Sequence, residues 1–262
     1  MNGNGQSATM WHDGDIGPTQ PSGHFRDLLQ PLSRVRYLIW RLFGGRGPIE
    51  LALNSGLRIK IRSLSTTDYG VAWDIYWRGC YQCPEPLPQV RRIVDLGANV
   101  GYSCLFWCQR FPDATVTAFE PHPEHLKAIA GHLSANRLAD RVTVIAAAAG
   151  VSEGSGYLAD AGSSSAITGT PDGYPIRVVD LFKTVKGPID LLKIDIEGSE
   201  YGLLADERFP DFGARTVVVE WHKTADRPDG KKWSEDRLHD CGYRTVAGFE
   251  DLPHAGLIWG FR

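Results

Sequence analysis

Two apolar runs in the second half of the chain each end in charged or ionisable side chains at every second position. Lys193, Asp195 and Glu197 close the first run, and Glu220 and His222 close the second. A strand buried in a parallel sheet is normally apolar along its whole length, so charges gathered at the strand ends need a reason beyond folding. Lys193 alone could simply neutralise a neighbouring carboxylate. The group as a whole predicts a ligand site, in which Lys193 and Glu197 bind substrate.

Asp195, Glu220 and His222 allow two kinds of catalysis. Imidazole has an unperturbed pKa near 6.5, so His222 suits a general base that the two carboxylates orient. Two carboxylates and one imidazole would also suit Mg²⁺ or Mn²⁺, and a bound cation lowers the pKa of an oxygen that it ligates. Both routes stay open. We prefer the metal site slightly, because orienting one base does not require two carboxylates.

A glycine-rich turn lies near the end of the first hundred residues, between an apolar run and a helical pattern. A strand that runs through such a turn into a helix is the nucleotide-binding corner of an open α/β sheet. The turn lacks the middle glycine of the dinucleotide fingerprint, so a smaller adenosine ligand fits better. Glu120 ends the next expected strand, where a carboxylate can accept both ribose hydroxyls. The candidate cofactor-binding residues are Asp95, Gly97, Ala98, Asn99, Gly101, Glu120 and His122.

These two corners resemble the cofactor site of class I S-adenosylmethionine (SAM) methyltransferases. The segment Lys193-Ile-Asp-Ile-Glu-Gly-Ser-Glu200 resembles the hallmark of FkbM-type SAM-dependent methyltransferases, and Glu220-Trp-His222 resembles their later E-x-H motif. The resemblance covers roughly residues 64–222. It implies a SAM cofactor and O-methylation of a small hydroxylated acceptor, typically a sugar or a polyketide-derived natural product. One departure is Ala146-Ala-Ala148, where the family commonly places polar groups against adenine, so packing and backbone would hold adenine here, with His122 nearby.

The surrounding elements alternate between strand and helix patterns. The expected elements are strand 91–97, helix 101–111, strand 115–120, helix 123–136, strand 142–148, strand 189–198, strand 215–222, helix 234–241 and strands 243–247 and 257–261. This order predicts a parallel sheet with right-handed crossovers, and with the resemblance it predicts a doubly wound, mostly parallel, seven-stranded Rossmann-like methyltransferase sheet. The two strands that end in the charged cluster should be neighbours.

Residues 25–88 are predicted to form a helical and hairpin cap before a SAM-binding domain at residues 89–262. Apolar residues recur at helical spacing from Phe25 to Phe43 with arginines between them, and Pro31 should kink or break this helix. We expect its apolar side to pack on its own domain, although such a helix could lie on a membrane or mediate a homo-oligomer. Residues 50–61 predict a hairpin.

Trp73 and Trp77 lie one helical turn apart in the cap, and we assign them to the substrate pocket as its apolar wall, against the alternative of ordinary core residues. Residues 1–24 are polar, rich in Gly, Ser and Pro, and lack a hydrophobic period, which predicts a mobile tail.

Composition limits the remaining functions. The chain has 262 residues, 42% of them hydrophobic, and a net charge of −3, which shows no electrostatic footprint for nucleic acid. No apolar run approaches the roughly twenty residues of a membrane span, and no secretory signal is evident. Five cysteines without a disulfide pattern favour a cytoplasmic location. Two functions other than O-methylation stay open: N-methylation of an amino-bearing metabolite, and SAM binding without catalysis.

Overall fold

The computed structural model describes residues 23–158, 167–168, 173–250 and 253–262. Most of the predicted tail, residues 1–22, lies outside the described residues, as do residues 159–166, 169–172 and 251–252. The tail prediction therefore stays a prediction.

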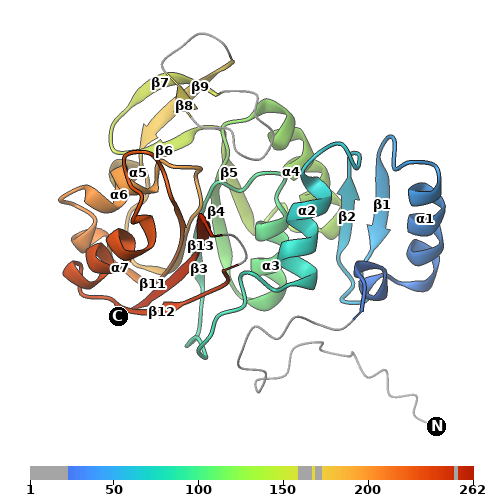
Figure 1. Ribbon diagram of the computed structural model, residues 1–262, viewed down its shortest axis with the longest axis horizontal. Helices are drawn as coiled ribbons and strands as arrows, with labels where there is room; N and C mark the ends of the chain where they lie inside the picture. Colours follow the sequence, from blue (N-terminus) through green and yellow to red (C-terminus); the bar gives the residue numbers. More distant parts are fainter. Residues whose placement is uncertain (1–22, 159–166, 169–172, 251–252) are drawn as a thin grey trace.

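A seven-stranded sheet in the order β12-β13-β11-β10-β3-β4-β5 forms the centre of the molecule (Figure 1). Five neighbouring strands run parallel, and β13 runs antiparallel to both β11 and β12. The strand order reverses between β3 and β10, as in a doubly wound sheet, so the predicted fold class is confirmed. The strands are β3 (Arg92–Leu96), β4 (Thr115–Phe119), β5 (Val142–Ile145), β10 (Ile189–Ile194), β11 (Ala214–His222), β12 (Arg244–Ala247) and β13 (Ala255–Phe261).

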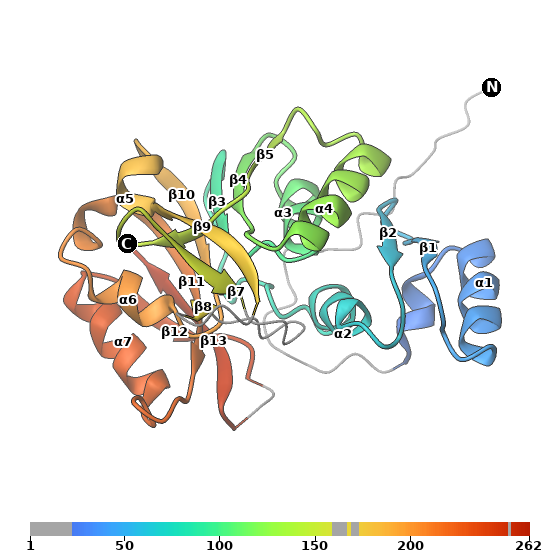
Figure 2. The ribbon, with the colours of Figure 1, turned by 90° about the horizontal axis from the view of Figure 1, so that it is seen from above.

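Alternate residues of the central strands feed two separate cores, because successive side chains of a strand point to opposite faces of the sheet. On one face, Ile93 and Leu191 pack with α3 (Tyr102–Arg110), α4 (Pro123–Asn136) and the cap. On the other face, Val94 and Leu192 pack with α5 (Leu181–Thr184), α6 (Glu200–Ala205) and α7 (Gly230–Asp240). Figure 2 shows the sheet between these two helical layers.

A smaller sheet covers one end of the central sheet, in the order β6-β9-β7-β8. Its strands are β6 (Ala148–Gly150), β7 (Gly154–Leu158), β8 (Ile167–Thr168) and β9 (Tyr174–Asp180). A short 3₁₀ turn, η3 (Pro210–Phe212), precedes β11.

The cap consists of the 3₁₀ turn η1 (Phe25–Leu28), α1 (Pro31–Leu42), the hairpin β1 (Ile49–Ala52) and β2 (Arg58–Ile61), α2 (Asp68–Ala72) and the π-helical turn η2 (Trp73–Trp77). The helix predicted from residue 25 breaks before Pro31, as expected of proline. The prediction that its apolar side packs on its own domain is wrong. Helix α1 buries Ser33 and Tyr37, and it leaves all five of its leucine, valine and isoleucine side chains exposed.

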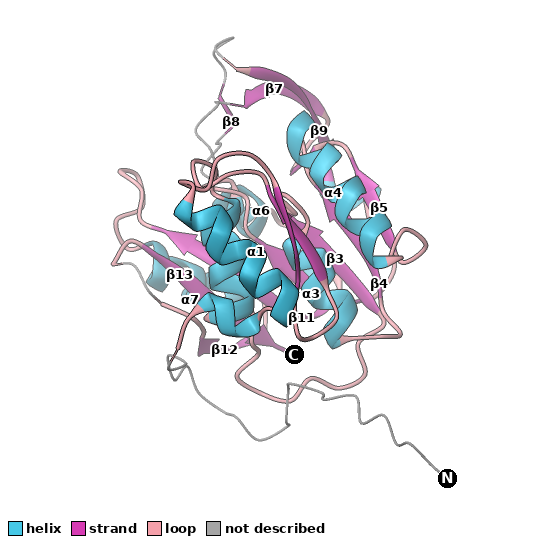
Figure 3. Ribbon diagram, turned by 90° about the vertical axis from the view of Figure 1, so that its right-hand side faces the viewer, coloured by secondary structure: helices cyan, strands magenta, loops and turns pink. Residues whose placement is uncertain are grey.

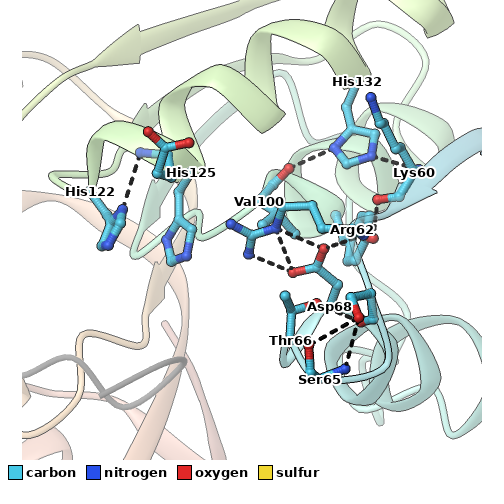
Figure 4. A network of polar contacts seen from close by, with 12 residues as sticks. Lys60, Arg62, Ser65, Thr66, Asp68, Val100, His122, His125 and His132 are labelled. Carbon is cyan, nitrogen blue, oxygen red and sulfur yellow. Dashed lines mark hydrogen bonds and ion pairs between the residues drawn. The ribbon is translucent and has the colours of Figure 1, made fainter. Parts of the chain in front are cut away.

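His132 of α4 fastens the cap hairpin to the sheet domain (Figure 4). Its Nε2 accepts the backbone N–H of Lys60 at 2.8 Å, and its Nδ1 lies 2.7 Å from the carbonyl oxygen of Val100. The first bond requires a bare Nε2, so His132 is the neutral tautomer that carries its proton on Nδ1. The hydroxyl of Tyr102 donates to the carbonyl of the same Lys60 at 2.7 Å. Helices α3 and α4 thus hold one hairpin residue through its backbone.

Candidate active site

A cavity of about 460 Å³ opens at the carboxyl ends of the central strands, where open α/β sheets bind their ligands. The glycine turn after β3 and the end of β4 form one side of it. The end of β10, the end of β11 and the cap residues before β3 form the other side. Of the predicted site residues, those that line the cavity are Gly97, Ala98, Asn99, Glu120, Lys193, Asp195, Glu197, Glu220 and His222.

The glycine turn approaches the end of β10 at van der Waals distance. Gly97 has a φ of 79°, and a Cβ built there would lie 1.8 Å from the carbonyl oxygen of Asp195. Gly101 has a φ of 90°, and its Cβ would lie 3.1 Å from Ile129 of α4, so this glycine serves helix packing. The first glycine therefore lets two corners of the site touch, and the second lets α3 and α4 approach.

Asn99 has a strained backbone and, among the described residues, an unpartnered side-chain oxygen, as expected of a residue that binds a ligand. Its backbone is left-handed, with a φ of 50°, which is uncommon for a residue other than glycine. Its side-chain Oδ1 is buried and has no hydrogen-bond partner within the described part of the chain. Because buried polar atoms normally have partners, an atom of this kind beside a cavity fits a residue whose partner is a ligand.

Backbone N–H groups from both sides orient the carboxylate of Glu120. Its Oε2 accepts the N–H of Asn99 and its Oε1 accepts the N–H of His122, each at 2.8 Å. The side chain is buried and lines the cavity, and Oε2 keeps a further lone pair. The carboxylate is therefore fixed in direction and retains the capacity to accept a hydroxyl from a ligand.

His125, which sequence reasoning missed, lies at this corner in place of His122. The ring of His125 lines the cavity, and its Nδ1 lies 3.3 Å from Glu120 Oε1. The ring of His122 stacks on it at 4.4 Å, while His122 Nδ1 accepts the N–H of Glu124 and so caps α4 (Figure 4). From this corner the side chain of His125 reaches the cavity, whereas the predicted His122 caps the helix and packs on His125.

Lys193 ties the two sides of the site together. Its ammonium donates to the carbonyls of Leu96 and Gly97 at 3.0 and 2.8 Å, and it lies 3.0 Å from Asp95 Oδ1 and 3.3 Å from Asp195 Oδ2. Burial would lower the pKa of Lys193, but the charges of Asp195 and Asp95 raise it. Lys193 is consequently a permanent cation, and the hydrogens of its ammonium group all point to protein acceptors. Asp95, fully buried beneath it, does not line the cavity.

Asp195 and Glu220 form a carboxyl pair that holds one proton. Burial opposes ionisation of Asp195, but the charge of Lys193 and hydrogen bonds from Glu220 and Tyr81 hold its pKa well below the usual range. Burial, followed by the negative charge of Asp195, raises the pKa of Glu220 well above its usual value. The Tyr81 hydroxyl donates to Asp195 Oδ2 at 2.6 Å. Asp195 is therefore the anion of the pair, and Glu220 is the acid.

His222 lies among three glutamates. Its Nε2 is 3.6 Å from Glu220 Oε2 and 3.7 Å from Glu197 Oε2, and its Nδ1 is 3.5 Å from Glu200 Oε1. Burial would lower the pKa of His222, but Glu200, Glu197 and Asp195 raise it. Burial and the charge of Asp195 raise the pKa of Glu197 to about 7. This arrangement stabilises a proton on the imidazole.

Glu200 was not predicted as a site residue, although it ends the hallmark segment. It starts α6 and is almost fully buried, and its Oε1 accepts the backbone N–H of Ile196 at 3.1 Å. Its position in the hallmark segment was the available signal, since the other charged residues of that segment line the cavity. No comparable signal marks Tyr81 or His254, which reach the cavity from irregular segments.

Trp73 and Trp77 do not line the cavity, contrary to their assignment to the substrate pocket. Their rings lie 5.7 Å apart, and Trp73 packs against Phe25 and Tyr69 in the cap. The intervening face of the same helical segment, with Asp74, Ile75 and Arg78, reaches the cavity instead.

The predicted metal site receives no support from the geometry. Within the described residues, no three His, Cys, Asp or Glu side chains form a group that could hold a metal ion. The residues present therefore do not fit Mg²⁺ or Mn²⁺ at Asp195, Glu220 and His222.

Comparisons with known proteins agree with this geometry. The methyltransferase FkbM domain matches residues 95–245, more than half of the chain. The methyltransferase sdnD of Sordaria araneosa is 25% identical over 217 residues, which are 64% of this chain and 80% of that protein. The crystal structure of an FkbM methyltransferase from Methylobacillus flagellatus shares the fold, at 18% identity and a TM-score of 0.51 over 72% of this chain. The alignment covers 47% of that larger chain, so this protein spans about half its length.

The matched region begins at Asp95, before the glycine turn, and includes Glu120, the Lys193–Glu200 segment and the E-x-H ending of β11. It thus contains both the cofactor corner and the carboxylate-rich corner of the cavity. On this evidence the chain belongs to the FkbM family of methyltransferases.

Proposed function

We propose that the protein methylates a hydroxyl group of a small metabolite, with SAM as the methyl donor and His222 as the general base. The observation that carries this proposal is the position of His222 on the cavity wall, among Glu197, Glu200 and Glu220. The opposite wall presents a carboxylate and an amide oxygen suited to an adenosine.

SAM would lie against the corner built by the glycine turn and β4. Glu120 would accept a ribose hydroxyl, since its direction is fixed by two backbone N–H groups. Asn99 Oδ1 would gain the partner that it otherwise lacks. Ala148 and Ala149, with Leu158, form an apolar lining suited to adenine. When bound, SAM supplies an electrophilic methyl group, so the protein need only align the acceptor and take one proton.

His222 would take that proton on Nε2. Nδ1 lies toward the buried Glu200, which favours the tautomer with its proton on Nδ1 and leaves the Nε2 lone pair for the acceptor hydroxyl. As the proton transfers, the surrounding glutamates stabilise the imidazolium. Lys193 and Asp195 position the cluster: Lys193 holds Asp195 as an anion, and Asp195 holds the proton of Glu220.

Mass spectrometry of methyl transfer to a panel of hydroxylated metabolites tests the proposal. His222→Gln should lower the rate by about 10²–10⁴-fold while SAM affinity stays unchanged. His239→Gln is the matched control, because His239 is an exposed histidine of α7 bonded to Thr245. The wild-type rate should fall as the pH drops through the raised pKa of His222, since the base must start neutral. An unchanged rate in His222→Gln would remove the base assignment.

N-methylation is the second candidate, because the acceptor side of the cavity is rich in carboxyl groups. Asp74, Asp195 and Glu197 line it, and these groups would attract an ammonium acceptor. Matched amine and hydroxyl acceptors distinguish the two reactions: turnover of the amine alone would replace the O-methylation proposal. SAM binding without turnover of either panel would favour a non-catalytic role.

A further inference from the structure

Helix α1 turns its apolar side away from the rest of the protein. With about 100° between successive residues, six large apolar side chains of α1 and its end fall within an arc of about 140°. This arc lies opposite the buried Ser33 and Tyr37. Six of the eight exposed large hydrophobic side chains in the described residues lie here. The members of this apolar face are Leu32, Val35, Leu38, Ile39, Leu42 and Phe43, from 44 to 81% exposed.

Arginines flank the apolar face on both sides. Arg36 borders one edge, Arg34 and Arg41 border the other, and Arg46 follows the helix. Residues 23–62 contain eight Lys and Arg against two acids, a net charge of +6 in a chain whose total is −3. Two of these arginines are paired, Arg34 with Asp27 and Arg62 with Asp68. The remaining excess of positive charge lies in the same part of the chain as the exposed apolar face.

A second copy of this chain is a poor occupant of the face. Two copies packed face to face would bring the flanking arginines of both helices together. Asp27 lies 4.0 Å from Arg34, and residues 28–49 include no further Asp or Glu that could compensate the other arginines. Like charges placed across an interface oppose association, whereas an anionic surface would neutralise them.

We propose that the apolar face and its arginines bind the surface of an anionic lipid bilayer. The helix would lie in the plane of the interface, with Leu42 and Phe43 among the acyl chains and Arg36 and Arg46 on lipid phosphates. Arg34 already bonds to Asp27, and Arg41 lies over the rings of Tyr37 and Tyr69. Nothing described blocks this approach, since α1 is the outermost element in Figure 1 and lies in front in Figure 3. None of the helices in the described residues has the length and apolar character of a transmembrane span, which fits binding at the surface.

Co-sedimentation of the full chain with phospholipid vesicles tests the proposal. Vesicles containing about one-third phosphatidylglycerol should bind the protein, vesicles of phosphatidylcholine alone should bind it far less, and added salt should weaken binding. The double variant Leu42→Ser/Phe43→Ser should reduce the partition coefficient by more than about tenfold. Val151→Ser, which changes an exposed apolar side chain elsewhere, should leave it unchanged. An unaltered thermal midpoint verifies that the double variant is folded.

Three outcomes would overturn the proposal. The first is no binding to anionic vesicles, or equal binding to uncharged ones. The second is a dimer in sedimentation analysis that Leu42→Ser/Phe43→Ser converts to a monomer, which would assign the face to a second copy. The third is vesicle binding only after residues 1–22 are removed, which would assign the face to the chain's own N-terminal segment.

Discussion

Glu120 is where one side chain performs two tasks at the proposed cofactor corner. Its oxygens accept the N–H groups of Asn99 and His122, and the same carboxylate faces the cavity. The backbone conformation at Asn99 and His122 and the orientation of the Glu120 carboxylate toward the cavity therefore depend on one another.

Glu120→Ala should weaken SAM binding by about 1.5–3 kcal/mol, the range for hydrogen bonds to a charged group. Isothermal titration calorimetry measures this loss. Glu124→Ala serves as the matched control, because Glu124 is an exposed glutamate nearby that pairs with Lys127. Equal affinity in wild type and Glu120→Ala would show that the ribose lies elsewhere.

Lys193→Met should lower the free energy of unfolding by about 3–5 kcal/mol, because it leaves the buried Asp95 and the partly buried Asp195 without their cation. Denaturant titration measures the change. Adding Asp95→Asn to Lys193→Met should recover part of the loss, since it removes one of the two uncompensated charges. A single variant as stable as wild type would contradict the bridging role.

At the scale of elements, the alternation of strands and helices along the central sheet was predictable, and the short helices were not. The helix at residues 123–136 follows directly from periodicity and its cap. Helix α6 has six residues and starts inside the hallmark segment, so its period is too short to detect. The exposure of the apolar side of α1 was also not predictable, because periodicity identifies an apolar side of a helix but not what that side contacts.

The contact between α4 and the cap hairpin should be sensitive to pH through His132. Burial lowers the pKa of His132, and its Nε2 must stay unprotonated to accept the Lys60 N–H. A base with a lowered folded pKa binds protons more readily when unfolded, so stability is complete above about pH 6.5 and falls as pH drops below it.

Thermal unfolding from pH 8 to pH 5 checks this expectation. His132→Phe should be less stable at pH 8, by about 1–3 kcal/mol for each backbone group left unpaired, and its stability should vary less with pH. His239→Gln should keep the wild-type profile, since His239 is exposed. A wild-type profile retained in His132→Phe would move the titration to another group.

At the scale of the whole molecule, topology brought together what sequence spacing had only suggested. Adjacent strands β10 and β11 deliver Asp195, Glu220 and His222 to one cavity, as expected from a doubly wound sheet. Tyr81 and His254 could not be predicted, because the irregular segments that carry them are placed by packing alone. The metal preference came from counting carboxylates, and a count does not reveal whether their side chains are placed to hold an ion, which within the described residues they are not.

Deleting residues 1–22 should leave the thermal midpoint within about 2 °C of the full chain. That segment contains few apolar side chains, so its removal exposes little surface. Calorimetric scans of both proteins measure the midpoint, and a much lower value for the shorter protein would show that the segment packs on the fold.

The contact between Gly97 and the carbonyl of Asp195 leaves no space for one corner of the site to move alone. Lys193 spans the same junction, with donors to Gly97 and an ion pair to Asp195. A shift of the glycine turn on loading with SAM must therefore reach the wall that receives the acceptor. The two ligands should consequently be energetically coupled, each changing the affinity of the other by the same factor.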